Sequence, residues 1–166
     1  AKEGLIKKEF SSRELVKACL LRIKEVDPKV KAFITVSEKE ALEAADEADK
    51  KMGDVSGLVD LRGIPFAIKD NFCTEGIKTT AASNVLSDYF PPYDATVVKK
   101  LKKAGAVVLG KTNMDAWAHG SSTETSDFFT TRNPWDITKL PGGSSGGSAA
   151  SIASDETIAS IGSETA

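Results

Sequence analysis

The 166 residues of this chain are enough to bury the hydrophobic core of one domain. Apolar residues make up 40% of the chain and charged residues 28%, which is typical of a soluble globular protein. The formal net charge of −2 argues against direct binding to nucleic acid, and no apolar run reaches the roughly 18–20 residues of a membrane span. We therefore expect no nucleic-acid surface and no membrane contact of its own.

The cysteines and the first ten residues indicate the cellular compartment of the protein. Cys19 and Cys73 lie far apart and fit neither a disulfide framework nor a zinc-ligand spacing. The first ten residues do not form a signal peptide. We expect reduced thiols in a cytoplasmic protein, or in an organellar matrix if the source is eukaryotic. Because the chain starts at Ala1 rather than Met, we also expect a fragment of a longer protein.

Hydrophobic periodicity and turn residues predict the elements of the N-terminal part. In chain order they are a helix from Ser11–Glu14 to Asp27-Pro28, a strand at 32–36 and a surface helix at 38–51. An N-cap serine followed by an acid opens the first helix. Ser37 with Glu40 predicts a capping box at the start of the second.

The remainder of the chain continues to alternate between helices and strands. We expect a loop at 53–60, a buried strand at 64–68, irregular chain at 73–93, a helix that Asp94 caps and Gly105 closes, a buried strand at 106–109, a short helix from Asp115 to His119 and a strand at 157–161. This alternation predicts an α/β fold with a mostly parallel or mixed sheet.

Residues 141–148 read Pro-Gly-Gly-Ser-Ser-Gly-Gly-Ser. Glycine tolerates backbone angles that a Cβ forbids, so this loop can hold the hydroxyls of Ser144 and Ser145 in an unusual geometry. A flexible Gly/Ser linker is the alternative. Pro141 at the entry and the small apolar helix start at 149–153 favour an ordered loop.

Gly105–Thr112 matches the Walker A pattern letter for letter. The four residues between its glycines are Ala-Val-Val-Leu, which favour a buried strand rather than a loop around a phosphate. We therefore expect no nucleotide site, and a local role for Lys111 at the end of a strand.

A serine nucleophile needs a proton acceptor, and the chain offers two candidates. His119 is the single histidine and has no carboxylate in a readable triad order, so a structural role is the simpler interpretation. Lys69 directly follows the buried strand, at a strand end where sites form in α/β sheets. Burial can lower a lysine pKa enough to make the amine a base. Asp70 should point to the opposite face, although Lys69 can equally be an ordinary strand-end lysine.

Taken together, these blocks resemble the amidase signature family. The matching blocks are Gly63–Asn71, Pro92–Thr96, Gly110–Asp115, Gly120–Glu124, Arg132–Asp136, Pro141–Ser148 and Gly162–Ala166. Their number and order are specific, and they cover residues 60–166 strongly and the N-terminal helices more loosely. Within that family, Arg132–Asp136 and Gly120–Glu124 look most like the A subunits of glutamyl-tRNA(Gln) amidotransferases.

The resemblance implies a mixed β-sheet covered by helices on both faces, with residues 1–166 as the N-terminal part of one amidase domain. It implies a Ser–cis-Ser–Lys triad in which Lys69 is the base and Ser144, after a cis peptide bond, is the bridging serine. The nucleophilic serine would fall about two positions beyond Ala166, and Ser163 is not its counterpart. Backbone N–H groups of Thr165 and Ala166 would form the oxyanion hole, with Ser145 in support.

The implied activity is release of ammonia from glutamine, within an ATP-dependent complex that converts Glu-tRNA(Gln) to Gln-tRNA(Gln). The partners would be the B and C subunits and, through the complex, the misacylated tRNA. This chain would bind no cofactor, because the partner subunit uses ATP and Mg. The 166-residue piece alone is expected to be inactive. A stand-alone amidase of a small amide and an inactive fragment that only binds partners are the alternatives.

Three positions depart from the family pattern. Glu164 stands where Asp is more frequent, Ala166 where Gly is common and His119 where the amidotransferase subunit often has Met. The change at His119 bears on the substrate pocket and on the subfamily assignment.

Overall fold

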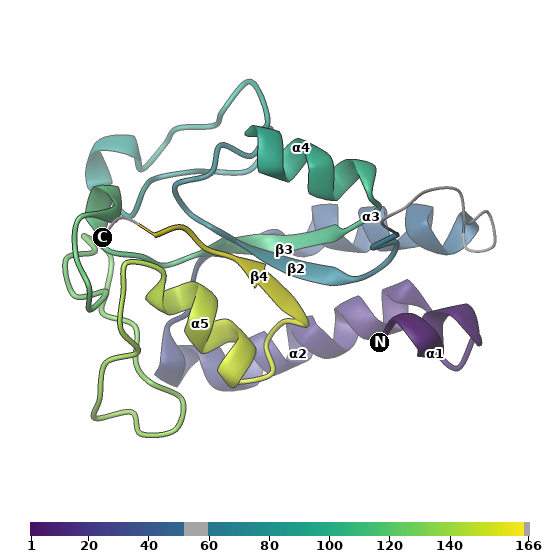
Figure 1. The fold of residues 1–166 in the computed structure, drawn as a ribbon, viewed down its shortest axis with the longest axis horizontal. Coiled ribbons are helices and arrows are strands. Elements are labelled where there is room, and N and C mark those ends of the chain that lie inside the picture. Colours follow the sequence, from purple (N-terminus) through teal and green to yellow (C-terminus); the bar gives the residue numbers. More distant parts are fainter. Residues whose placement is uncertain (52–59, 165–166) are drawn as a thin grey trace.

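In the computed structural model, which describes residues 1–51 and 60–164, a mixed sheet organises the fold (Figure 1). Its described strands are β1 (Phe33–Val36), β2 (Pro65–Lys69), β3 (Val107–Thr112) and β4 (Ala159–Ile161), in the order β1-β3-β2-β4. β2 runs parallel to both β3 and β4, and β1 runs antiparallel to β3. The predicted mixed α/β architecture is confirmed.

Helices cover both faces of the sheet, as Figure 1 shows. The elements are α1 (Lys2–Ile6), α2 (Ser12–Val30), α3 (Glu38–Lys50), α4 (Thr96–Lys103) and α5 (Gly146–Ala153), with 3₁₀ turns η1 (Asn84–Leu86) and η2 (Ala116–Ala118). Strand side chains alternate between two cores. Ala67 and Leu109 pack in the core with α2, α3 and α5, whereas Phe66 and Val108 pack in the core with α1 and α4.

The start of α2 is as predicted, but its end is not. Ser11 caps the helix and forms a capping box with Glu14. The helix continues through Pro28 to Val30, where Lys31 closes it in the left-handed region. Two further contacts explain the extra residues: the backbone N–H of Lys31 donates to the Asp27 carbonyl at 2.8 Å, and Val30 is buried in the core.

Two other predictions about caps are wrong. Ser37 is the N-cap of α3 as expected, but no capping box forms: its side chain makes no cap hydrogen bond, and its N–H, which Glu40 would bind in such a box, donates to the Leu109 carbonyl of β3. Ala95 is the N-cap of α4. The Asp94 carboxylate instead accepts from the Glu75 backbone N–H and the Lys102 ammonium.

The remaining differences are small. β3 extends beyond the predicted 106–109 to Thr112, because Gly110–Thr112 still pair with both β1 and β2. The short helix expected after Asp115 is the single turn η2. The loop predicted at 53–60 lies outside the described residues except for Asp60. Within 1–51 and 60–164, no helix combines the length and hydropathy needed to cross a bilayer.

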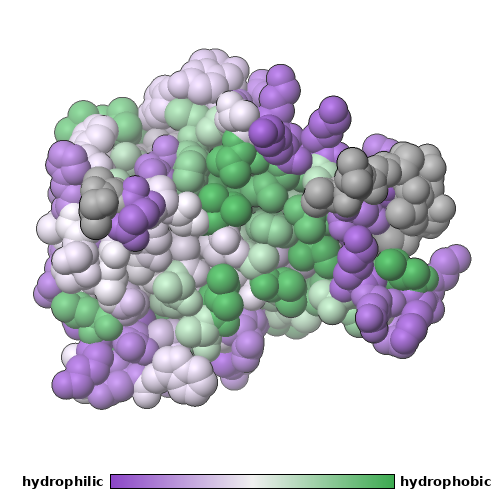
Figure 2. Space-filling model, in the orientation of Figure 1, coloured by the Kyte–Doolittle hydropathy of each residue, from purple (hydrophilic) through white to green (hydrophobic). Residues whose placement is uncertain are grey.

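β4 lies at the end of the strand order, so its outer edge pairs with no strand among the described residues. In the same orientation as Figure 1, Figure 2 shows hydrophobic residues gathered in the middle of the face on which β4 lies. Ala159 and Ile161 of β4 are half-buried there against the core of α4, and Ile158 before them is exposed.

Two carboxyl groups, the half-buried Asp27 of α2 and the buried Glu156 of the turn before β4, lie near each other. Asp27 accepts from the backbone N–H of Ala32 at 2.5 Å, and Glu156 accepts from the Ser154 hydroxyl at 2.9 Å. The negative charge of Asp27 acts on the Glu156 carboxyl group. Burial, followed by the charge of Asp27, raises the pKa of Glu156 to about 8. The Glu156 carboxyl group is therefore mostly protonated in the folded protein at neutral pH.

This pair predicts a pH-dependent stability. The folded pKa of Glu156 lies above the ordinary value of 4.5, so the folded state loses stability as pH rises from about 4.5 to 8. Glu156→Gln removes that titration. From pH 5 to pH 8.5 the unfolding free energy of the intact wild-type protein should fall by about 1–4 kcal/mol more than that of the variant. Urea unfolding of both proteins at the two pH values measures these changes. Equal changes in wild type and variant would contradict the prediction.

Candidate active site

The site is built around Lys69, the last residue of β2, whose side chain is 0% exposed. Its Nζ lies 2.7 Å from the Ser144 Oγ. Ser144 belongs to the segment between η2 and α5, 75 residues further along the chain, and is 3% exposed. The structure therefore brings together the two side chains that the sequence marks out as base and bridging serine.

The Gly/Ser segment is an ordered loop and not a linker. The Gly143–Ser144 peptide bond is cis. The Ser144 carbonyl accepts from the Asp115 backbone N–H at 3.1 Å, and the Gly147 N–H donates to the Asn113 carbonyl at 3.0 Å. The loop then runs directly into α5. These bonds fix the loop to the chain that follows β3.

Ser163 forms a third part of the cluster, which sequence reasoning did not place there. The Lys69 Nζ is 2.9 Å from the Ser163 Oγ, and the Asn71 amide donates to the same hydroxyl at 3.1 Å. Ser145 holds the backbone of Ser163, donating to its carbonyl at 2.8 Å and accepting from its N–H at 3.1 Å.

The surroundings of Lys69 favour a neutral amine. Burial lowers its pKa from the ordinary 10.5, and the negative charges of Glu164 and Asp115 oppose that shift. Its hydrogen-bond partners are hydroxyls and a carbonyl, which do not require a positive charge. An amine in this setting can accept the proton of the Ser144 hydroxyl.

Asp70 points away from Lys69, as predicted. Its carboxylate accepts from the backbone N–H and the hydroxyl of Thr80, and lies 3.5 Å from the Lys111 Nζ. Burial raises the pKa of Asp70, and burial lowers the pKa of Lys111 to about 8. Lys111 also donates to the Phe72 carbonyl and the Thr79 hydroxyl. Lys111 thus has the local role predicted for it, and the residues before it form a strand rather than a phosphate loop.

The other candidates lie apart from this cluster or outside the described residues. His119 is exposed on the loop after η2. Thr165 and Ala166, the predicted oxyanion-hole residues, lie outside the described residues. In the described part of the chain, no three His, Cys, Asp or Glu side chains are arranged to hold a metal ion. Cys19 and Cys73 are free thiols.

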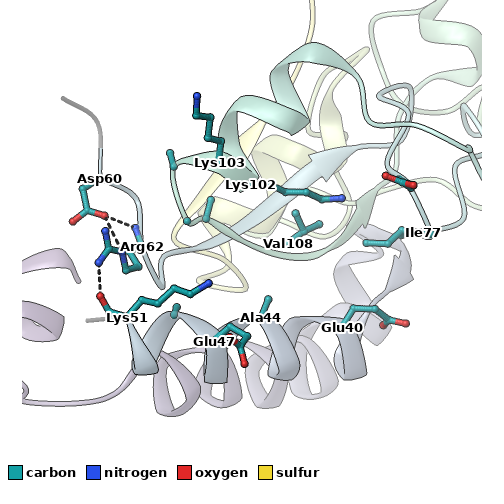
Figure 3. A pocket seen from close by; sticks show the side chains of 16 residues that line it. Glu40, Ala44, Glu47, Lys51, Asp60, Arg62, Ile77, Lys102, Lys103 and Val108 are labelled. Carbon is teal, nitrogen blue, oxygen red and sulfur yellow. Dashed lines mark hydrogen bonds and ion pairs between the residues drawn. The ribbon is translucent and has the colours of Figure 1, made fainter. Parts of the chain in front are cut away.

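A pocket of about 600 Å³ lies elsewhere, between α3, the end of α4 and the chain before β2 (Figure 3). It reaches Arg62 before β2 and Gly105 before β3, so it lies toward the ends of these strands opposite to Lys69. Acidic and basic side chains balance in its lining, and Arg62 is bonded to Asp60 and to the Lys51 carbonyl. It contains none of the clustered residues and is not the candidate active site.

The model of the family described as Amidase matches residues 14–166. The chain belongs to the amidase family. It is 56% identical over 99% of its length to the A subunit of the glutamyl-tRNA(Gln) amidotransferase of Desulfatibacillum aliphaticivorans. The A subunit of the same enzyme from Heliobacterium modesticaldum is 53% identical over 97% of the chain.

Solved structures agree with the family. The glutamyl-tRNA(Gln) amidotransferase A subunit from Thermotoga maritima superposes with a TM-score of 0.76 at 48% identity, over 91% of this chain and 30% of its own. A protein described in connection with the evolutionary origins of an s-triazine catabolic enzyme superposes with a TM-score of 0.92 at 38% identity, over 98% of this chain and 36% of its own. The chain spans about a third of the length of the curated relatives it matches, with 34% of the Desulfatibacillum protein covered.

Two glycines of the Ser144 loop predict unequal effects of the same substitution. A Cβ at Gly147 would lie 2.5–2.6 Å from backbone atoms of Ala32 and Asn113, which cannot move aside. A Cβ at Gly142 would meet nothing, although its φ of +87° strains any other residue. In the intact protein, Gly147→Ala should destabilise by about 3 kcal/mol or more and Gly142→Ala by about 1 kcal/mol. Thermal unfolding measures both, and equal effects would contradict the packing.

Proposed function

We propose that the intact protein is the glutamine-hydrolysing A subunit of an ATP-dependent glutamyl-tRNA(Gln) amidotransferase. The observation that carries the proposal is the 2.7 Å contact between the Lys69 amine and the Ser144 hydroxyl in a buried site. The amidase family, together with relatives of that name at 53–56% identity, supports this choice of substrate.

In the proposed mechanism, neutral Lys69 accepts the proton of Ser144 while Ser144 accepts the proton of the nucleophilic serine beyond Ala166. That serine attacks the side-chain amide carbon of glutamine and forms a tetrahedral oxyanion. Backbone N–H groups of Thr165 and Ala166 stabilise the oxyanion, with Ser145 fixing the chain that leads to them. The relay returns a proton to the departing nitrogen as ammonia forms, and water then hydrolyses the acyl-enzyme.

The fate of the ammonia belongs to the partners. We propose that a B subunit phosphorylates the glutamate of Glu-tRNA(Gln) with ATP and Mg and accepts the ammonia, with a C subunit completing the complex. The net charge of −2 is consistent with tRNA being bound mainly by a partner.

Removing either Lys69 or Ser144 from the relay should greatly lower turnover. In the full-length protein, Lys69→Ala and Ser144→Ala should each lower kcat for ammonia release from glutamine on the order of 10²–10⁴-fold. Lys99→Ala, on the exposed face of α4, is the matched control and should leave kcat unchanged. Near wild-type turnover in Lys69→Ala would rule out the relay.

The relay also predicts a pH profile. Lys69 is a base only when neutral, so kcat/KM should rise with pH to a plateau, with a midpoint below the ordinary lysine value of 10.5. Lys69→Arg keeps the positive charge and cannot become neutral, so it should be inactive across the range. If Lys69→Arg is active and its kcat/KM rises with pH as in wild type, a group other than Lys69 is responsible for that rise.

A stand-alone amidase acting on another small amide is the second candidate. The solved relatives with TM-scores of 0.84–0.86 include peptide amidases, which share this fold at 35–36% identity. Comparison of kcat/KM for glutamine and for a peptide amide, with and without a B subunit, separates the two. Preference for the peptide amide would replace the first proposal and retain the same relay.

A further inference from the structure

The buried carboxylate of Asp115 collects hydrogen bonds from the loop that follows it. Asp115 lies three residues after β3 and is 0% exposed. Its Oδ2 accepts from the backbone N–H groups of Ser122 at 3.2 Å and Thr123 at 2.9 Å. Its Oδ1 accepts from the Thr125 hydroxyl at 2.9 Å and from the Thr125 N–H at 3.4 Å. The loop at 122–125 is thus folded around one carboxylate.

The same residue is tied to the serine loop. The Asp115 backbone N–H donates to the carbonyl of Ser144 at 3.1 Å. A second bond, from the Thr123 hydroxyl to the Gly142 carbonyl at 2.7 Å, joins the loop that Asp115 organises to the same segment. Asp115 therefore connects the chain after β3, the loop at 122–125 and the peptide that carries Ser144.

Two glycines show how closely the carboxylate is enclosed. A Cβ at Gly120 would collide with the Asp115 carboxyl group, and a Cβ at Gly143 would collide with its Oδ2 and with the Ser122 nitrogen. The carboxylate lies between these two backbones. Displacing it would let the 120–125 loop and the Gly143–Ser144 peptide shift relative to each other.

The charge of Asp115 faces the relay as well. Among the described residues, no lysine or arginine forms an ion pair with it. It raises the pKa of Lys69, as does Glu164, against the larger effect of burial. The remaining neighbours of the Lys69 amine are the uncharged Ser144 and Ser163, while Asp70 is paired with Lys111 on the other face.

We propose that Asp115 is the positioning residue of the Lys69–Ser144 pair: its carboxylate holds the 122–125 loop, while its backbone N–H and that loop hold the segment that carries Ser144. The negative charge of Asp115 is a separate, electrostatic influence on Lys69. This assignment rests on the proposed amide hydrolysis for its kinetic readout. Asp115 does not touch the reacting atoms and acts through Ser144 and Lys69.

The test is Asp115→Asn in the full-length protein. The amide keeps the volume but presents an NH₂ group to backbone donors, so Ser144 is held less well. We expect kcat for glutamine to fall about 10–100-fold with KM changed less than about 3-fold. Because a negative charge is lost, the rising limb of the kcat/KM profile should move to lower pH. A purely structural role would lower activity without moving that limb.

Asp127→Asn is the control. Asp127 also organises a loop, accepting from the Ser83 hydroxyl at 3.0 Å and the Asn84 N–H at 2.8 Å, but it does not bear on the charge of Lys69. Its kcat and pH profile should match wild type. A limb that moves equally in both variants would overturn the proposal, as would wild-type kcat in Asp115→Asn.

A second readout keeps this inference separate from the proposed function. The pH dependence of Lys69 labelling by an amine-reactive reagent, followed by mass spectrometry, reports its protonation without any substrate. The labelling midpoint should move to lower pH in Asp115→Asn. If wild type hydrolyses no amide, the proposed function fails and this midpoint alone decides: a shift supports the electrostatic role, and an unchanged midpoint overturns it.

Thr125→Val decides the positioning role if Asp115→Asn does not fold. It removes one hydroxyl donor to the carboxylate and keeps the charge. We expect kcat to fall about 3–10-fold with the Lys69 labelling midpoint unchanged. Unchanged kcat in this variant would overturn the positioning role.

Discussion

Burial of a lysine amine at the end of β2 is the constraint on which the rest of the site depends. An ammonium group without water is costly unless another charge compensates it. Around Lys69 the protein supplies hydroxyls and a carbonyl as direct partners, and acids only at a distance. Proton transfer with Ser144 is then accessible because neither protonation state of the amine is strongly locked.

Lys111 on the neighbouring strand shows the other solution. In the sheet register Lys111 lies opposite Ile68 and Lys69 lies opposite Thr112, so the two lysines are one residue out of phase and face opposite sides. Both are 0% exposed. Lys111 has a direct carboxylate partner in Asp70, and its bonds to Phe72 and Thr79 hold the chain after β2. One buried lysine is thus a structural tie and the other is available for chemistry.

Much of the fold followed from local patterns, and the errors share a cause. Strands and helices with clear periodicity were predictable, as was the capping box of Ser11 and Glu14. The predicted end of α2 at Pro28 and the predicted cap of α4 at Asp94 are wrong because tertiary contacts decide both. The core position of Val30 extends α2, and Asp94 binds Glu75 and Lys102 instead of capping α4. Neither contact has a signature in nearby sequence.

The site was predictable to a similar degree. The glycine-bounded serines pointed to Ser144 and Ser145, and the apolar run marked Lys69 as one of two candidate bases. The resemblance to the amidase signature family then selected Lys69 and Ser144. Ser163 and Asp115 carry none, because their contacts form only in the folded chain: Ser163 with Lys69 and Asn71, and Asp115 with its own loop and with Ser144. A carboxylate whose partners are main-chain N–H groups looks like any surface aspartate until the chain is folded. The catalytic roles themselves, and those of Thr165 and Ala166, stay predictions.

The free margin of β4 has a practical consequence for handling this polypeptide. Among the described residues no strand pairs with the outer edge of β4, so another extended chain can hydrogen-bond there, and the exposed Ile158 beside it adds an apolar contact. Produced by itself at high concentration, the 166-residue polypeptide should self-associate through this margin. A charged substitution at Ile158 is the natural remedy for solubility, since it leaves both interior cores intact.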